Sequence, residues 1–165
     1  MKLRIGSMIK REAKKKEISS KYIAEKLSSY RQNSDKIFRM DDINIEDLIR
    51  ISFLLKYNFL HYIVKDYISH LSFSVTDLES SHFLVNNNNG NCEFLSQILI
   101  GEKIKEVADN NNWNKQKVAE ILNCTPTIVS YLFKRKSVKV KKLLEVSDAF
   151  QYDFISNVYL SEMSI

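Results

Sequence analysis

An internal repeat covers most of this 165-residue chain. Sliding the sequence by 95 residues lays residues 5–63 on residues 100–158 without a gap, and 13 of the 59 aligned pairs are identical. The identities include glycine and alanine positions, such as Gly6 with Gly101 and Ala24 with Ala119. A chance overlap of two amphipathic segments does not explain identity at such positions over this length. The sequence therefore predicts two copies of one small domain.

The repeat divides the chain into a first domain at residues 1–70, a connector at residues 71–95 and a second domain at residues 96–165. The connector contains no Lys or Arg, and its residues 86–91 read Asn-Asn-Asn-Asn-Gly-Asn. Because Asn and Gly tolerate positive φ, we expect an exposed loop there. The apolar stretches on either side of it, residues 82–85 and 92–95, form either a hairpin or, in the second case, the start of a helix.

Composition favours helices and excludes several classes of protein. Three glycines and one proline are too few for the turns of a β-rich fold or for a phosphate-binding loop. The two cysteines stand 32 positions apart and the chain has only three histidines, so we expect no metal site, no disulfide and no cofactor. No set of catalytic side chains stands out, so we do not expect an enzyme.

Charge and hydropathy suggest a cytoplasmic protein with a polyanionic partner. No apolar run approaches the roughly 20 residues that span a bilayer, and the N-terminus lacks the apolar stretch of a signal peptide. The net charge is +5 and the isoelectric point is near 9.1. Residues 1–70 carry 15 basic and 9 acidic residues, so much of the positive charge lies within the repeats.

Apolar spacing predicts four or five short helices in each copy. In the second copy the first helix begins at Ile100 and ends at the asparagines 110–112, and a short second helix follows around residues 118–122. Thr125 as N-cap with Pro126 behind it starts a third helix. The apolar residues that mark this third helix are Ile128, Val129, Leu132 and Phe133. A fourth helix runs from about Val140 to Phe150, and an aromatic segment at residues 152–159 closes the copy.

The junction between the second and third helices is short, so these helices must cross at a steep angle. Such a crossing requires a small residue at the contact, which Ala119 supplies. It also requires a residue that tolerates a left-handed backbone at the turn, which Asn123 supplies. Leu122 before the turn and Val129 after it close the angle by apolar contact. We further expect Trp113, which aligns with Ile18, in the core, and Cys124 as a small buried residue.

Residues 115–134 read Lys-Gln-Lys-Val-Ala-Glu-Ile-Leu-Asn-Cys-Thr-Pro-Thr-Ile-Val-Ser-Tyr-Leu-Phe-Lys. This segment resembles the helix-turn-helix of the Cro/phage-repressor (XRE-type) DNA-binding family. Residues 20–39 resemble it more weakly, because Ser29 and Ser34 stand where the family usually has apolar residues. With the flanking helices the resemblance covers both copies. It implies an all-α fold of two tandem lambda-repressor-like helix-turn-helix domains.

The resemblance also implies which residues contact DNA, because the family places its third helix in the major groove. In the second copy Lys115, Gln116, Lys134, Arg135 and Lys136 face the phosphate backbone, while Thr125, Pro126, Thr127, Ser130 and Tyr131 lie at the start and outer side of the third helix. In the first copy the corresponding residues are Arg31, Gln32, Asp35 and Lys36, with Asn33 beside them and Ser20, Lys21 and Arg39 on the flanks. Arg suits guanine, and Gln or Asn suits adenine. Asp35, within this set, repels phosphate unless it meets cytosine.

The resulting hypothesis is sequence-specific binding of double-stranded DNA, with regulation of transcription as the role. The chain acts on DNA either as a homodimer or as an intramolecular pseudo-dimer that reads half-sites about one helical turn apart. The alternative is a helix-turn-helix scaffold that serves as a protein-interaction or antitoxin-like module with weak or no DNA binding. An apolar patch on the third helices favours this alternative, and a continuous positive face favours DNA.

Overall fold

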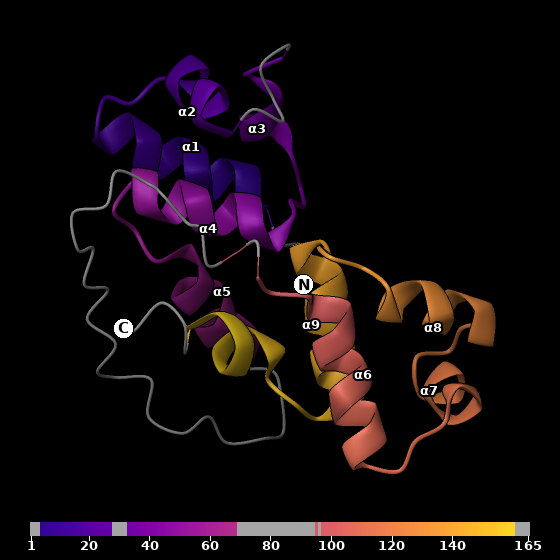
Figure 1. Cartoon of the computed structure of the whole chain (residues 1–165). Coiled ribbons are helices and arrows are strands. Elements are labelled where there is room, and N and C mark those ends of the chain that lie inside the picture. Colours follow the sequence, from indigo (N-terminus) through magenta and orange to yellow (C-terminus); the bar gives the residue numbers. More distant parts are fainter. Residues whose placement is uncertain (1–3, 28–32, 69–94, 96, 161–165) are drawn as a thin grey trace.

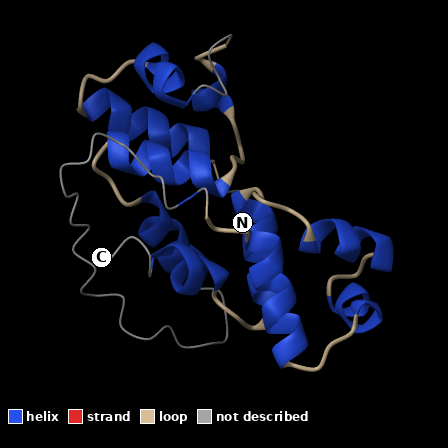
Figure 2. Ribbon diagram, viewed as in Figure 1, coloured by secondary structure: helices blue, strands red, loops and turns tan. Residues whose placement is uncertain are grey.

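The structure, a computed structural model, describes residues 4–27, 33–68, 95 and 97–160. These residues form helices with no strand among them, so the predicted all-α fold is confirmed (Figure 2). The helices are Ile5–Lys15 (α1), Ser20–Leu27 (α2), Lys36–Arg39 (α3), Ile45–Leu54 (α4), Phe59–Ile68 (α5), Ile100–Asn110 (α6), Lys115–Ile121 (α7), Pro126–Phe133 (α8), Val140–Phe150 (α9) and the π-helical Ile155–Leu160 (η3). The predicted connector lies outside the described residues except for Leu95, which is buried. None of the described helices is both long and apolar enough to cross a bilayer.

Helix α6 begins and ends where its apolar spacing predicts. Its buried side carries Ile100, Ile104 and Ala108, at helical spacing. The chain leaves the helix through Asn112, whose φ of 58° is left-handed, and the Trp113 amide then donates to the Ala108 carbonyl at 2.9 Å. This closure satisfies a carbonyl that the end of a helix would otherwise leave without a partner.

The turn between α7 and α8 has the predicted chemistry. Ala119 is 2% exposed at the contact, and Asn123 adopts a left-handed φ of 47°. Thr125 is the N-cap of α8, where its hydroxyl accepts from the Ile128 amide, and Pro126 occupies the first turn. The steep crossing therefore rests on a small residue, a left-handed asparagine and a capped helix start.

Two further predictions concerned single side chains. Trp113 packs against the core as expected, with its ring edge-on to Phe150 at a centroid distance of 5.2 Å. Cys124 is only half-buried, although it too packs against the core and its thiol is free. The Cys124 amide donates to the Ala119 carbonyl at 2.8 Å, which holds this residue at the rim of the turn instead of beneath it.

Local geometry recurs in the structure at the same spacing of 95 residues. Helices α1 and α6 start at equivalent positions, as do α4 and α9. Backbone hydrogen bonds that close the turns recur too, with equal donor–acceptor distances: Ile18 to Ala13 and Trp113 to Ala108 at 2.9 Å, and Tyr57 to Ser52 and Tyr152 to Ser147 at 3.0 Å. The ring pairs Tyr57–Phe59 and Tyr152–Phe154 have centroid distances of 4.8 and 4.7 Å. The same helix starts, turn-closing hydrogen bonds and ring pairs therefore occur in both halves of the described chain.

The two halves, residues 4–68 and residues 95–160, share one buried apolar cluster. Figure 1 shows α4 and α5 of the first half facing α9 and η3 of the second. The backbones pair where the halves meet: the Ile45 amide donates to the Val138 carbonyl at 3.0 Å, and the Val140 amide donates to the Ile43 carbonyl at 2.9 Å. The Tyr67 hydroxyl also donates to the Leu144 carbonyl at 3.2 Å. The halves are thus joined by core packing and by backbone hydrogen bonds.

A carboxyl group is buried in part at this junction. Burial raises the pKa of Glu46, and nearby Asp47 raises it further, while Ser137 of the other half and Arg50 oppose the rise only in part. A folded-state pKa above the unfolded value means that the folded chain binds the proton more tightly. The charged form of Glu46 therefore weakens the fold, and the contribution of this carboxyl group to stability rises as the pH falls through its pKa.

We expect Glu46→Gln to raise the free energy of unfolding at neutral pH, because glutamine occupies the same volume without a charge. The gain should shrink as the pH falls from 7 toward the unfolded pKa of 4.5, where the wild-type carboxyl is itself protonated. Urea unfolding midpoints at several pH values measure this difference. Glu102→Gln is the matched control, since Glu102 also lies in the first turn of a helix but is exposed. An equal effect in both variants would contradict a raised pKa at Glu46.

Candidate nucleic-acid interface

Helix α8 is anchored by its apolar side. Val129 is fully buried, and Leu132 and Phe133 are 6% and 9% exposed. Helix α6 approaches α8 so closely that a Cβ atom on Gly101 would lie 2.5–2.7 Å from backbone oxygens of Leu132, Phe133 and Arg135. The Gly101 amide donates to the Arg135 carbonyl at 2.9 Å. The position of α8 is therefore fixed by its buried apolar side chains and by the close approach of α6 at Gly101.

The opposite side of α8 is exposed to solvent. Thr127 is exposed there, and Ser130 is half-buried. Ile128 and Tyr131 are 50% and 67% exposed. Ile128 departs from the prediction that grouped it with the apolar residues marking this helix. It lies three residues before Tyr131 and shares the outward side, because helical spacing turns Val129 and Leu132 inward instead.

The start of α8 combines capping with exposure. Thr125 and Pro126 are both exposed, and the Thr125 hydroxyl is used in the cap described above. Pro126, Thr127, Ser130, Tyr131 and Lys134 line one shallow hollow on the outward side. The structure thus brings most of the residues predicted for the base-reading surface of the second copy together along one side of one helix.

Three cations follow directly after α8. Lys134, Arg135 and Lys136 are exposed, and no ion pair joins any of them to another described residue. Two exposed lysines of the neighbouring helices differ, since Lys103 pairs with Glu106 at 3.1 Å and Lys117 pairs with Glu120 at 3.6 Å. Helix α8 itself carries no charged residue. The positive charge is therefore concentrated at its C-terminal end.

The start of α7 adds a further cation. Lys115 and Gln116 are exposed at the first positions of this helix, which Asn114 caps by accepting from the Lys117 amide at 2.8 Å. Lys115, Ser130 and Lys134 line a second hollow, whose α6 side carries acidic residues including Glu102 and Asp109. Lys115 thus lies with Lys134 beside the second half of α8, and acidic residues of α6 line the same hollow.

The first half presents a smaller set of the predicted residues. Asn33, Lys36 and Arg39 are exposed around α3, whereas Arg31 and Gln32 lie outside the described residues, as does Ser29. Ser34 is half-buried.

Asp35 stands just before α3, and its carboxylate accepts from the Ser20 hydroxyl at 2.8 Å. This bond links the start of α2 to the start of α3. Asp35 therefore has a local structural partner that the sequence alone did not reveal.

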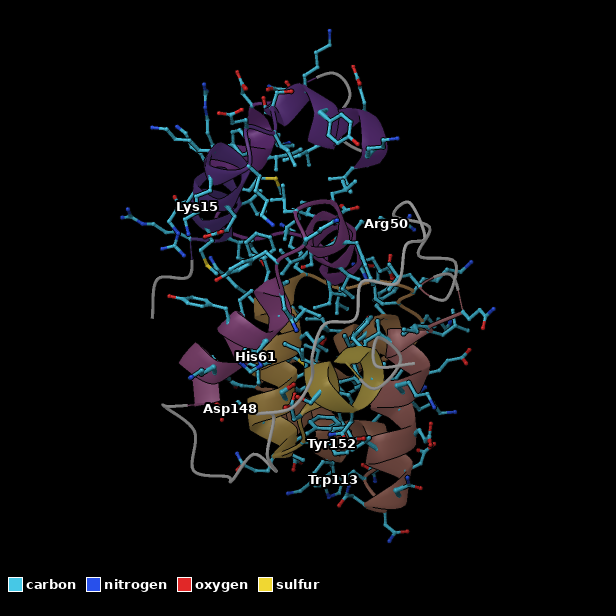
Figure 3. The ribbon with its side chains drawn as sticks, turned by 90° about the vertical axis from the view of Figure 1, so that its left-hand side faces the viewer. Lys15, Arg50, His61, Trp113, Asp148 and Tyr152 are labelled. Carbon is cyan, nitrogen blue, oxygen red and sulfur yellow. The ribbon has the colours of Figure 1, made fainter. Side chains whose placement is uncertain are left out.

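Helices α3 and α8 both lie at the periphery of the molecule (Figure 1). In Figure 1, α3 and α8 lie along the upper and right-hand margins, while α5 and η3 lie together on the lower-left side. Figure 3 places Lys15 in the first half, with Trp113 and Tyr152 near one another at the far end of the second.

Among the described residues, no group of three or more His, Cys, Asp or Glu side chains is arranged to hold a metal ion. The absence of a catalytic activity remains a prediction from the sequence. Comparison of the chain with protein-family models, with curated proteins and with solved structures finds no match.

Proposed function

We propose that this protein binds double-stranded DNA sequence-specifically through α8 and acts as a regulator of transcription. One observation carries the proposal. Helix α8 is held by buried residues on one side, presents Thr127, Ser130 and Tyr131 on the other, and ends in three exposed cations without a described ion-pair partner. A helix of this kind has the dimensions that the major groove of B-DNA admits.

The side chains divide by chemistry into two groups. Lys115 and the cations at residues 134–136 suit phosphate oxygens, which supply affinity without sequence information. Thr127, Ser130 and Tyr131 carry hydroxyl groups, which both donate to and accept from base edges. Ile128 adds an apolar surface of the kind that contacts the methyl group of thymine. In the first half Lys36 and Arg39 serve the phosphates, and Asn33 suits adenine.

The phosphate contacts predict a strong salt dependence. Replacing Lys134, Arg135 and Lys136 together by Gln should weaken binding to random duplex DNA about tenfold at moderate salt, and should lower the slope of log K against log salt by about three. Fluorescence anisotropy across a salt series measures both quantities. The control replaces three other helical lysines, Lys65, Lys103 and Lys142, by Gln, so that the net charge changes equally. Equal losses in both variants would contradict a local interface.

The base contacts predict a different signature. Thr127→Ala should weaken binding to a preferred duplex by about 1 kcal/mol and leave the salt slope unchanged, because threonine carries no charge. Thr127 is exposed, so its removal should leave the folded chain intact. The same free-energy change on preferred and random duplexes would show that Thr127 does not read sequence.

The exposed apolar surface of α8 favours the second candidate function, a protein-interaction or antitoxin-like module. Ile128 and Tyr131 stand outward on a helix without charge, which is typical of a surface that packs against a partner protein. The salt series distinguishes the two functions. Absence of salt-dependent DNA binding by the wild-type chain would reject the DNA proposal and favour this module.

A further inference from the structure

The two halves are joined by a reciprocal pairing of equivalent residues. Asn44 and Lys139, which are 95 positions apart, form an isolated antiparallel β-bridge. Of the two backbone hydrogen bonds described above, one runs from residue 45 to residue 138 and the other from residue 140 to residue 43. Adding 95 to residue 45 gives residue 140, and subtracting 95 from residue 138 gives residue 43, so the second bond is the first with the two halves exchanged. A contact that is unchanged by this exchange has a local two-fold axis.

Contacts beside the bridge follow the same axis. Helices α5 and η3 pack together, and they begin at nearly equivalent positions. The Asp42 carboxylate accepts from the Lys141 amide at 3.1 Å, in the first turn of α9 in the other half. Ser137, the equivalent of Asp42, lies beside Glu46, the equivalent of Lys141. The Asp42–Lys141 hydrogen bond therefore adds a polar contact between the halves beside the bridge.

The junction is also well buried. Ile43, Ile45 and Val140 are all fully buried beside the bridge. The bridging residues Asn44 and Lys139 are exposed, but the paired amides and carbonyls belong to their buried neighbours. Such pairing resists sliding, because a shift would leave these amides and carbonyls without partners. Because α3 belongs to one half and α8 to the other, the junction between the halves sets the relative orientation of these two helices.

B-DNA has its own two-fold axes, because its strands are antiparallel. Two reading helices related by a two-fold axis therefore meet half-sites that are inverted relative to each other, not repeated in one direction. Building on the proposed function, we infer that a single chain of this protein occupies two inverted half-sites, with α8 in one and α3 in the other. A second copy of the chain is not required.

The two half-sites differ in sequence, because equivalent positions carry different side chains. Tyr131 on α8 corresponds to Lys36 on α3, and Ser130 corresponds to Asp35. Tyr131 and Lys36 are both exposed, so each is free to meet DNA. A hydroxyl-bearing ring and an ammonium group do not select the same bases or phosphates. The two half-sites on the DNA are therefore inverted relative to each other and differ in base sequence.

The test begins with selection of duplexes from a random DNA pool by the full chain. We expect an enriched site with two unlike, inverted half-sites, bound by one chain per duplex in native mass spectrometry. Two altered duplexes then leave the protein unchanged. Reversing one half-site to make a direct repeat, or inserting about five base pairs between the halves, should weaken binding about 100-fold, because only one helix then engages.

Protein variants assign the halves. Tyr131→Ala should change the preferred bases in one half-site, and Lys36→Ala should weaken contacts at the other. The inference is overturned by two chains on an enriched site, by a preference for direct repeats, by tolerance of the five-base-pair insertion, or by both variants acting on one half-site. Failure to enrich any sequence would overturn the proposed function itself, so the two failures are distinguishable.

Discussion

Gly101→Ala is expected to destabilise the chain by about 2 kcal/mol, although alanine normally favours a helix over glycine by about 1 kcal/mol. The reason is steric. The added methyl group would lie 2.5–2.7 Å from three backbone oxygens at the end of α8, and backbone cannot rotate away as a flexible side chain can. Helix α6 must therefore separate from α8, which also displaces the candidate DNA-binding surface.

Gly6 gives an independent version of this experiment. A Cβ atom there would lie 2.6–2.8 Å from backbone atoms of Ile37 and Met40, so Gly6→Ala should destabilise to a similar extent. Glu102→Ala, at the exposed position next to Gly101, is the control and should change stability little. Urea unfolding monitored by circular dichroism gives the free energies. A stabilised Gly101→Ala variant would show that the helices do not approach as closely as described.

Phe154→Ala is expected to lower the free energy of unfolding by about 3–5 kcal/mol, the range found for truncating a fully buried phenylalanine. Phe154 has no exposed surface, and its ring contacts Tyr152 at 4.7 Å and Phe150 at 5.8 Å between centroids. Removing the ring leaves a cavity and also two aromatic neighbours without their partner, and each such pair adds about 0.5–1.5 kcal/mol. The surrounding turn is too well hydrogen-bonded to collapse into the space.

Phe59, the equivalent of Phe154 in the first half, allows the free-energy losses at the two positions to be compared. It is also fully buried, but among the described residues the Tyr57 ring alone lies against it, at 4.8 Å between centroids. Phe59→Ala should therefore destabilise less than Phe154→Ala. Because both halves share one core, each variant should unfold in a single transition that is detected equally by all probes. Two separate transitions, with only one of them shifted, would show that the halves unfold independently.

Much of the helical order was predictable because it depends on neighbours in sequence. The spacing of Ile100, Ile104 and Ala108 predicts α6, and the Thr125-Pro126 pair predicts the start of α8. The left-handed conformation at Asn123 followed from the shortness of the turn. Each of these features is decided within a few residues, where propensity and periodicity act.

The orientation of Ile128 was not predictable in the same way. Helix α8 has five apolar residues among its eight positions, more than one side of a short helix can bury. Which of them faces outward depends on where α6 and α7 pack against it, and helical spacing alone does not decide this. Exposed Ile128 is consequently the residue of the candidate surface that pattern reasoning missed.

Glu12 illustrates a buried charge that the repeat could have indicated. Its side chain is only 5% exposed, and it pairs with Lys15 at 2.9 Å and with Arg11 at 3.3 Å. Burial alone would raise the pKa of Glu12, but these two cations outweigh it and hold the pKa below the ordinary value. The equivalent residue in the second half is Val107, an apolar side chain. A charge aligned with an apolar residue is the signal that this position faces the core.

The contact between the halves was beyond sequence reasoning for a different reason. Residues 43–45 and 138–140 lie where α4 and α9 begin, at Ile45 and Val140, and of these two helix starts the apolar spacing predicted the one near Val140. Their backbone groups pair with one another across 95 residues, and neither periodicity nor propensity encodes a partner at that separation. The candidate site was predicted residue by residue, but the arrangement of α3 relative to α8 emerged only from the three-dimensional structure.

The bridge between Asn44 and Lys139 has a consequence for how this protein can change over generations. In an assembly of identical chains every mutation appears on both sides of the symmetry axis at once. Here each side is encoded separately, so a substitution alters one half and leaves its counterpart intact. The pairing itself uses backbone atoms, which most substitutions preserve. Each half is therefore free to acquire its own binding specificity, while the backbone pairing that holds the two halves together persists.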